Sequence, residues 1–394
     1  MSSAALASNC KSLAPVRKPQ RHSAMITIEA IKFNHDSTRT ICDALNVRRN
    51  ASEFVPGPEW QRLRSTRPED SCAAYALEPI DERRITIKVL LSSINRRLRS
   101  AQVRVPDCVK GRIVRFFEGA TRFLTFELID PPVMRGRVGI WNVEWQWEYR
   151  LSSSEAWRVF MTTRHRIYVV LAVPTAPWKQ TPYAASNLQL PWTDALDYAC
   201  RWAAGASTKD MAAGLITERL YSLGPTIVTY DCPGGGSSHY SQIGFDATAF
   251  LDRLRGGIGN GLYVNCSDCA AIVSTFANAL GCNLWQSRMG WDFSLNEVLA
   301  IGSAEWQTAC NWGRFNYHEV AWKRSCTARE PVYDACLQVD GSDDPTVPPH
   351  TPLLPRNLRF GRSGDLLYRD RLASPPGRDR CNPQPGTRQK RPVE

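Results

Sequence analysis

Residues 265–281 read NCSDCAAIVSTFANALG, and this stretch combines a helix start signal, an apolar helical pattern and a helix stop signal. Asn265 is a favourable N-cap, and Asp268 can return a hydrogen bond to the amide of the cap, as in a capping box. The apolar residues that follow recur at helical spacing, and Gly281 is suited to end the helix. We therefore predict a helix whose first residue is Cys266.

The predicted position of Cys266 favours a nucleophilic thiol. The first amides of a helix have no intrahelical partner, and the positive end of the helix dipole stabilises a thiolate relative to a thiol. Asp268 opposes this effect unless its charge is taken up by the capping bonds. A thiol nucleophile also needs a base that a third group orients. His318 and Asp334 are suitable residues further along the chain.

Segments 315–323 and 331–339 both alternate between apolar and polar residues, and a polar turn separates them. This pattern predicts an antiparallel hairpin. A register with His318 opposite Asp334 places both on one face, so the carboxylate can hold the far imidazole nitrogen while the near one faces Cys266.

Two other interpretations of these residues stay open. His239, on the Gly-rich loop 232–239, is a rival base, but we prefer His318 because a base needs an orienting carboxylate and a rigid platform. The same loop lacks the Lys-Ser/Thr of a phosphate loop. Cys266 and Cys269 form a C-x-x-C pair, which is also compatible with redox chemistry, half of a zinc site, or structural burial in an inactive protein.

In these residues the chain resembles the transglutaminase-like superfamily of papain-like Cys-His-Asp cysteine enzymes, and its bacterial members in particular. The resemblance covers about residues 195–342. It is carried by Cys266, Asp268 and Ala270 of the nucleophile motif, by Leu280-Gly281, by His318 with Trp322, and by Asp334.

The resemblance implies an α+β fold in which the helix bearing the Cys packs on an antiparallel sheet. It implies Cys266 as nucleophile, His318 as base and Asp334 as orienting residue, with no cofactor and no metal. The implied activity acts on amide bonds of a protein or peptide substrate through a thioester, with acyl transfer, deamidation or proteolysis as the outcome. The backbone amide of Cys266 is the expected oxyanion donor, and Gln242 is a weaker candidate.

The spacing between Cys266 and His318 is longer than in compact bacterial relatives, which implies an insertion within about 283–312. Four tryptophans fall in this region, and we expect them to fill a core rather than to wall an acyl cleft. They are Trp285, Trp291, Trp306 and Trp312.

The N-terminal half has the alternation typical of β-strands, and we predict an all-β, sandwich-like domain over residues 25–175. In 139–151, tryptophans and other apolar residues alternate with polar ones. The Trp-rich face is expected to be core, although it is also compatible with a binding platform. An inactive transglutaminase-like protein that recognises a partner through this face is therefore the alternative function.

Composition divides the rest of the chain. We expect a disordered basic N-terminus over 1–24, with Met25 as a possible true start, and a Pro-rich linker over 176–192. The catalytic domain is then 193–342, and a Pro- and Arg-rich disordered tail occupies 343–394.

The charge and the cysteine content limit which partners and which cellular location we expect for the protein. The net charge is +11, but segments 1–24 and 351–394 carry ten of these charges, so residues 25–350 are nearly neutral. We therefore expect no nucleic-acid partner. With no signal peptide, no membrane-spanning run and 13 scattered Cys, we expect a cytoplasmic protein with mostly reduced thiols, leaving signal-less export open. The sequence does not indicate an oligomeric state.

Overall fold

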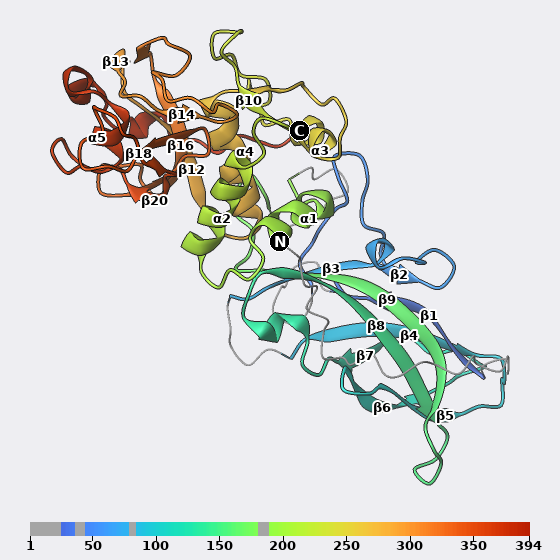
Figure 1. Ribbon diagram of the computed structural model, residues 1–394. Helices are drawn as coiled ribbons and strands as arrows, with labels where there is room; N and C mark the ends of the chain where they lie inside the picture. The colour runs from blue at the N-terminus through green and yellow to red at the C-terminus, as the bar shows by residue number, and fades with distance from the viewer. Residues whose placement is uncertain (1–24, 36–43, 79–83, 180–188) are drawn as a thin grey trace. The chain divides into compact units, whose positions relative to one another are not determined.

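The computed structural model divides the chain into two compact units (Figure 1). It describes residues 25–35, 44–78, 84–179 and 189–394. The first unit comprises the described residues of 1–47 and 54–170, and the second those of 48–53, 171–180 and 185–394. The predicted disordered N-terminus, 1–24, lies outside the described residues.

The first unit is built from two sheets. One has the order β2-β1-β4-β7, with β1 (Ile26–Lys32), β2 (Trp60–Gln61), β4 (Thr86–Ser93) and β7 (Leu124–Glu127). The other has the order β3-β9-β8-β5-β6, with β3 (Cys72–Ala76), β5 (Ser100–Val105), β6 (Val109–Arg115), β8 (Gly139–Arg150) and β9 (Arg158–Val170). Only β3 and β9 pair in parallel among these strands of the described chain. Two short 3-10 turns are η1 (Pro68–Asp70) and η2 (Pro132–Arg135).

Residues from both sheets share one hydrophobic core, which makes the unit sandwich-like. The predicted alternation along β8 is present: Trp141, Trp145 and Trp147 are 9%, 3% and 0% exposed and belong to this core. Since these indoles are covered by protein, the Trp-rich face of β8 is not an accessible binding platform.

The second unit mixes helices with antiparallel sheets. Its helices are α1 (Thr193–Trp202), α2 (Lys209–Tyr221), α3 (Ala247–Leu254), α4 (Cys266–Ala279) and α5 (Tyr368–Leu372). Its largest sheet has the order β12-β16-β17-β20, with β12 (Leu284–Met289), β16 (His318–Lys323), β17 (Pro331–Tyr333) and β20 (Arg356–Arg359). Every residue of α4 is buried, and this helix packs against β12 and β16 (Figure 1). The predicted α+β character is therefore present.

Smaller elements surround this arrangement. The parallel pair is β10 (Thr229–Tyr230) and β11 (Tyr263–Val264), and the antiparallel pair is β13 (Phe293–Ser294) and β15 (Arg314–Phe315). A three-stranded sheet contains β14 (Leu299–Ala300), β18 (Leu337–Asp340) and β19 (Pro352–Leu353). Two 3-10 turns, η3 (Pro375–Arg380) and η4 (Pro385–Thr387), follow α5.

The boundary between the units differs from the predicted linker at 176–192. After the first unit ends at residue 170, the chain enters the second unit at residue 171, and the described residues of the Pro-rich segment belong to that unit. Trp178 and Trp192 are 1% and 0% exposed, and Trp178 Nε1 donates to the carbonyl of Thr275 on α4 at 2.8 Å. The prolines suggested a spacer, but the tryptophans between them anchor the segment.

The predicted disordered tail, 343–394, is instead folded into the second unit. Tyr368, Leu372 and Cys381 are fully buried. The arginines that suggested disorder are partly satisfied by backbone carbonyls; Arg371 Nη1, for example, donates to the carbonyls of Asp340 and Ser342. Composition does not reveal such bonds, because their acceptors lie elsewhere in the sequence.

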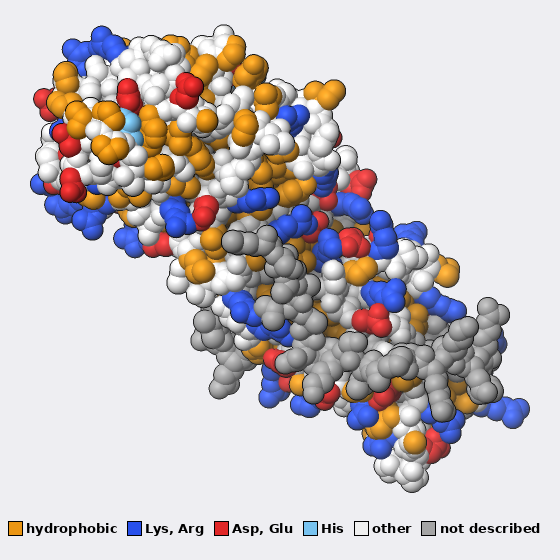
Figure 2. Space-filling model, viewed as in Figure 1, with side chains coloured by type: hydrophobic (Ala, Val, Ile, Leu, Met, Phe, Trp, Pro, Cys, Tyr) orange, Lys and Arg blue, Asp and Glu red, His pale blue; other side chains and the backbone are white. Residues whose placement is uncertain are grey.

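The surface view adds to the charge pattern. On the face drawn in Figure 2, Lys and Arg side chains occur in small groups with Asp and Glu side chains among them. Within the described ranges, no helix combines the length and the apolar character that crossing a bilayer requires.

Candidate active site

The N-terminus of α4 has the predicted geometry. Asn265 is the N-cap, its Oδ1 accepts from the amide of Asp268 at 2.9 Å, and Asp268 Oδ2 accepts from the amide of Asn265 at 3.1 Å. Cys266 is the first helical residue and is 6% exposed. Gly281 follows the helix with a φ of +84°, a left-handed conformation that favours glycine. The predicted helix and its capping box are therefore confirmed.

Asp268 does more than cap the helix. Its carboxylate also accepts from Ser238 Oγ, the amides of His239 and Tyr240, and Ser241 Oγ, at 2.6 to 2.9 Å. The buried charge is thus shared among many donors. These bonds hold the end of the Gly-rich loop and the two residues after it against the first turn of α4.

The structure brings His318 and Asp334 together. His318 Nε2 lies 3.0 Å from Asp334 Oδ2, and the two side chains are 0% and 1% exposed. Asp334 Oδ1 accepts from the amide of Cys336 at 2.8 Å. One carboxylate oxygen of Asp334 is therefore held by a backbone amide, while the other oxygen faces the imidazole.

The strand register differs from the prediction by two residues. Ala321 pairs with Tyr333, whereas the predicted register pairs Ala321 with Pro331. A shift of two keeps every side chain on its face, because side chains alternate along a strand. His318 and Asp334 consequently meet from diagonal rather than directly opposed positions.

Asp334 contacts only one of the two ring nitrogens of His318. Nδ1 is buried and has no hydrogen-bond partner among the described residues. Burial lowers the pKa of His318, but the charge of Asp334, its hydrogen bond and the neighbouring Cys266 sulfur outweigh this and raise it to about 10. Asp334 and Cys266 thus favour the protonated imidazole of His318.

A pocket of about 320 Å³ opens onto Cys266. Its lining includes Cys266, Tyr230, Gly236, Trp312 and Tyr317. Burial, with the nearby Cys336 and Cys266, raises the pKa of Tyr230 well above its usual value, so its hydroxyl keeps its proton and can donate it.

The four tryptophans of 283–312 are not in the core that the sequence predicted for them. Trp291 is 72% exposed and Trp312 is 38% exposed. Trp312 lies 6.1 Å from Tyr230 between ring centroids and lines the pocket. For Trp312 the other interpretation, a wall of the cleft, fits the structure.

A disulfide holds two walls of the pocket together. Cys232 and Cys310 are bonded, which links the Gly-rich loop to the segment that carries Trp312. Cys108 is disulfide-bonded as well, whereas eight described cysteines are free and buried. The expectation of mostly reduced thiols therefore fits the eight free cysteines but not these three.

The rival residues lie elsewhere. His239 Nε2 is 3.1 Å from Asp231 Oδ2, and Gln242 is exposed and does not line the pocket of Cys266. For Cys269, a hydrogen bond with Cys336 favours the thiolate, but burial and the nearby carboxylate of Asp268 outweigh it and raise the pKa. Cys269 is 1% exposed and does not line the pocket of Cys266.

Sequence reasoning missed three contributors to the site. Tyr230 belongs to a two-residue strand with no motif, and Cys232 gave no pairing signal. Tyr368 Oη donates to Asp334 Oδ2 at 2.7 Å, on the oxygen that also contacts His318. No sequence signal marked Tyr368, because it lies in the segment predicted to be disordered.

The described residues offer no metal centre, since no group of three or more His, Cys, Asp or Glu among them is placed to hold an ion. Cys266 and Cys269 are both free thiols. The C-x-x-C pair therefore lacks the further ligands that a zinc site requires.

Comparisons with known proteins give a limited result. No protein-family model matches the chain, and no curated protein matches it in sequence. Among solved structures, the chain is similar to red sea bream transglutaminase, with a TM-score of 0.34 and 9% identity. The match covers 64% of this chain and 48% of the transglutaminase. A similarity at this level carries no argument about activity, so the functional inference depends on the site.

Proposed function

We propose that the second unit is a cysteine enzyme of transglutaminase-like type that acts on amide bonds of proteins or peptides. The observation that carries the proposal is the buried His318–Asp334 pair together with Cys266, which lies at a helix N-terminus and lines a pocket. Such an arrangement supplies a nucleophile, a proton carrier and an orienting carboxylate.

In the proposed reaction the Cys266 sulfur attacks the carbonyl carbon of a glutamine side chain or a peptide bond. His318 Nδ1 accepts the proton of the thiol as the sulfur attacks. As donors to the negative oxygen that forms we propose the backbone amide of Cys266 and the hydroxyl of Tyr230, because both residues line the pocket. When the carbon–nitrogen bond breaks, the imidazolium gives its proton to the leaving ammonia or amine, and a thioester to Cys266 is left.

The second half of the reaction decides the outcome. Water that loses a proton to His318 hydrolyses the thioester, which gives deamidation or proteolysis. A primary amine that attacks in the same way gives a new amide and therefore a crosslink. In both cases the thiolate is released and His318 carries the proton back to the starting state.

The first test is the reactivity of the thiol. Iodoacetamide should label Cys266 selectively near neutral pH, and His318→Ala should abolish this selectivity. Cys269→Ala and His239→Ala are matched controls that should label like the unaltered protein. Uniform slow labelling of many cysteines would contradict the proposal.

The second test identifies the reaction. The protein is incubated with a glutamine-containing protein and a labelled primary amine, while incorporation of the label, ammonia release and peptide cleavage are measured. Cys266→Ala should lower the productive rate by at least about 10³-fold. A rate that Cys266→Ala leaves unchanged would assign the activity to other residues.

A further inference from the structure

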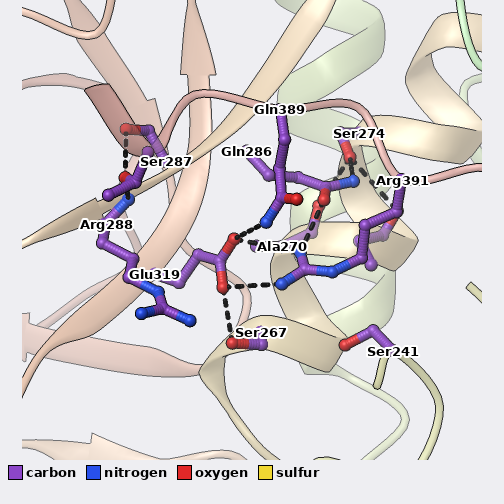
Figure 3. A network of polar contacts seen from close by, with 12 residues as sticks. Ser241, Ser267, Ala270, Ser274, Gln286, Ser287, Arg288, Glu319, Gln389 and Arg391 are labelled. Atoms are coloured by element: carbon purple, nitrogen blue, oxygen red, sulfur yellow. Dashed lines mark hydrogen bonds and ion pairs between the residues drawn. The ribbon is translucent and has the colours of Figure 1, made fainter. Parts of the chain in front are cut away.

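A buried ion pair joins the end of the chain to strand β16. Arg391 Nη1 lies 2.9 Å from Glu319 Oε1 and Arg391 Nη2 lies 3.0 Å from Glu319 Oε2, with the side chains 6% and 0% exposed (Figure 3). Arg391 Nη1 also donates to Gln286 Oε1 on β12 at 2.6 Å. The guanidinium thus binds two neighbouring strands of the sheet in a bidentate geometry.

The same carboxylate reaches the first turn of α4. Ser267 Oγ donates to Glu319 Oε2 at 2.5 Å, and Ser267 is 3% exposed. Figure 3 shows Ser267, Glu319 and Arg391 converging on one point between the helix, the sheet and the C-terminal segment. The backbone of that segment is fixed as well, since the amides and carbonyls of Gln286 and Gln389 exchange two bonds of 2.9 Å.

The contact between Ser267 and Glu319 affects the candidate site because of where these two residues lie in the chain. Ser267 directly follows Cys266, and Glu319 directly follows His318. A bond between Ser267 and Glu319 therefore limits how far the helix turn that holds the thiol can shift along the strand that holds the imidazole. Arg391 in turn fixes the carboxylate that makes this bond.

A buried ion pair of this kind is a poor way to gain stability, because the desolvation of both charges offsets their attraction. It does impose geometry, since the planar guanidinium fork accepts only a narrow range of carboxylate orientations. Catalytic groups are sensitive to such constraints, and a displacement of about 1 Å can cost roughly 10²-fold in rate.

We propose that Arg391, Glu319 and Ser267 form a positioning brace that sets the separation of Cys266 and His318. This inference rests on the proposed function of that pair. The C-terminal segment then contributes to the geometry of the site through Arg391, which does not line the pocket of Cys266.

The test is the pH dependence of Cys266 alkylation by iodoacetamide in the full chain, together with the melting temperature. Ser267→Ala keeps the buried ion pair and removes only its link to the thiol turn. We expect alkylation near pH 6 to slow about 10- to 100-fold, with the half-maximal rate displaced to higher pH. Arg391→Lys keeps the charge but loses the planar fork of the guanidinium. Its alkylation rate should lie between the rates of the unaltered protein and of Ser267→Ala.

The matched control is Thr217→Val, which removes another buried hydroxyl from a helix of the same unit. Thr217 Oγ1 donates to the carbonyl of Ala213 at 2.8 Å and has no part in the brace. It should change the melting temperature without changing the alkylation profile.

The outcomes separate the two proposals. Unselective alkylation in the unaltered protein would overturn the proposed function itself. Selective alkylation that Ser267→Ala leaves unchanged in rate and pH profile would overturn the brace alone. If Arg391→Lys does not fold, Ser267→Ala still decides the question, because it leaves the ion pair in place.

Discussion

Replacing Tyr368 by Phe removes one donor from the carboxylate that orients His318. Tyr368 Oη donates to Asp334 Oδ2 at 2.7 Å, and His318 Nε2 contacts the same oxygen at 3.0 Å. Without the phenol, the charge of this oxygen is shared with the imidazolium alone. We therefore expect the protonated imidazole to be held more strongly and the pKa of His318 to rise further.

The magnitude follows from the type of bond. A hydrogen bond to a charged group contributes about 1.5–3 kcal/mol. Only the part that differs between the two protonation states of His318 shifts its pKa, and one pKa unit corresponds to about 1.4 kcal/mol. An upward displacement of about 0.5–1 unit in the basic limb of the pH–rate profile is expected.

The assay is the alkylation rate of Cys266 between pH 5 and 11, with thermal unfolding measured in parallel. Tyr333→Phe is the matched control, because Tyr333 Oη donates to the carboxylate of Asp210 at 3.2 Å, away from His318. Both variants should lower the melting temperature, but only Tyr368→Phe should displace the profile. Identical profiles for Tyr368→Phe and the unaltered protein would refute the reasoning.

Three further perturbations test other parts of the second unit. Replacing Cys232 and Cys310 by Ser removes a disulfide that spans 78 residues. Chain entropy predicts that the free energy of unfolding falls by about 4.5 kcal/mol. An unchanged midpoint in chemical denaturation would argue against this. Burial alone raises the pKa of Asp340, but its backbone donors and His350 outweigh this and lower it to about 2. The ionised carboxylate of Asp340 thus stabilises the fold at pH values above 3.8, its pKa in the unfolded chain. This stabilisation is lost as the pH falls through 2, its pKa in the folded protein. Thermal unfolding from pH 2 to 5 should be less pH-dependent in Asp340→Asn, and an equally steep dependence would disprove the assignment. Trp312→Ala should speed alkylation by a bulky maleimide more than by iodoacetamide, because the indole narrows the pocket. An equal effect on both reagents would show that it does not.

The helix that carries Cys266 could be predicted because its signals are local. An N-cap, a capping box and a left-handed glycine act within a few residues, so residues 265–281 contain the information that they need. The choice of His318 over His239 depended on alternation in two adjacent segments. A register shift of two residues leaves every side chain on the same face of its strand. For this reason the predicted face was right while the predicted register was wrong.

The rest of the site depends on contacts between distant parts of the chain. Tyr368 and Arg391 lie in a segment whose composition predicts disorder, yet they bind Asp334 and Glu319. Composition measures what a segment can bury on its own, and it says nothing of a partner that another element supplies.

The sequence by itself determined the helix, the position of Cys266 at its start, the strand of His318 and the strand that ends just before Asp334, because these follow from interactions between near neighbours. Only the tertiary structure decided the register of the hairpin, the Cys232–Cys310 bond and the use of the C-terminal segment as part of the site. The physical reason is that buried charges and thiols are stabilised by whichever partners the folded chain brings to them, and those partners are far away in sequence.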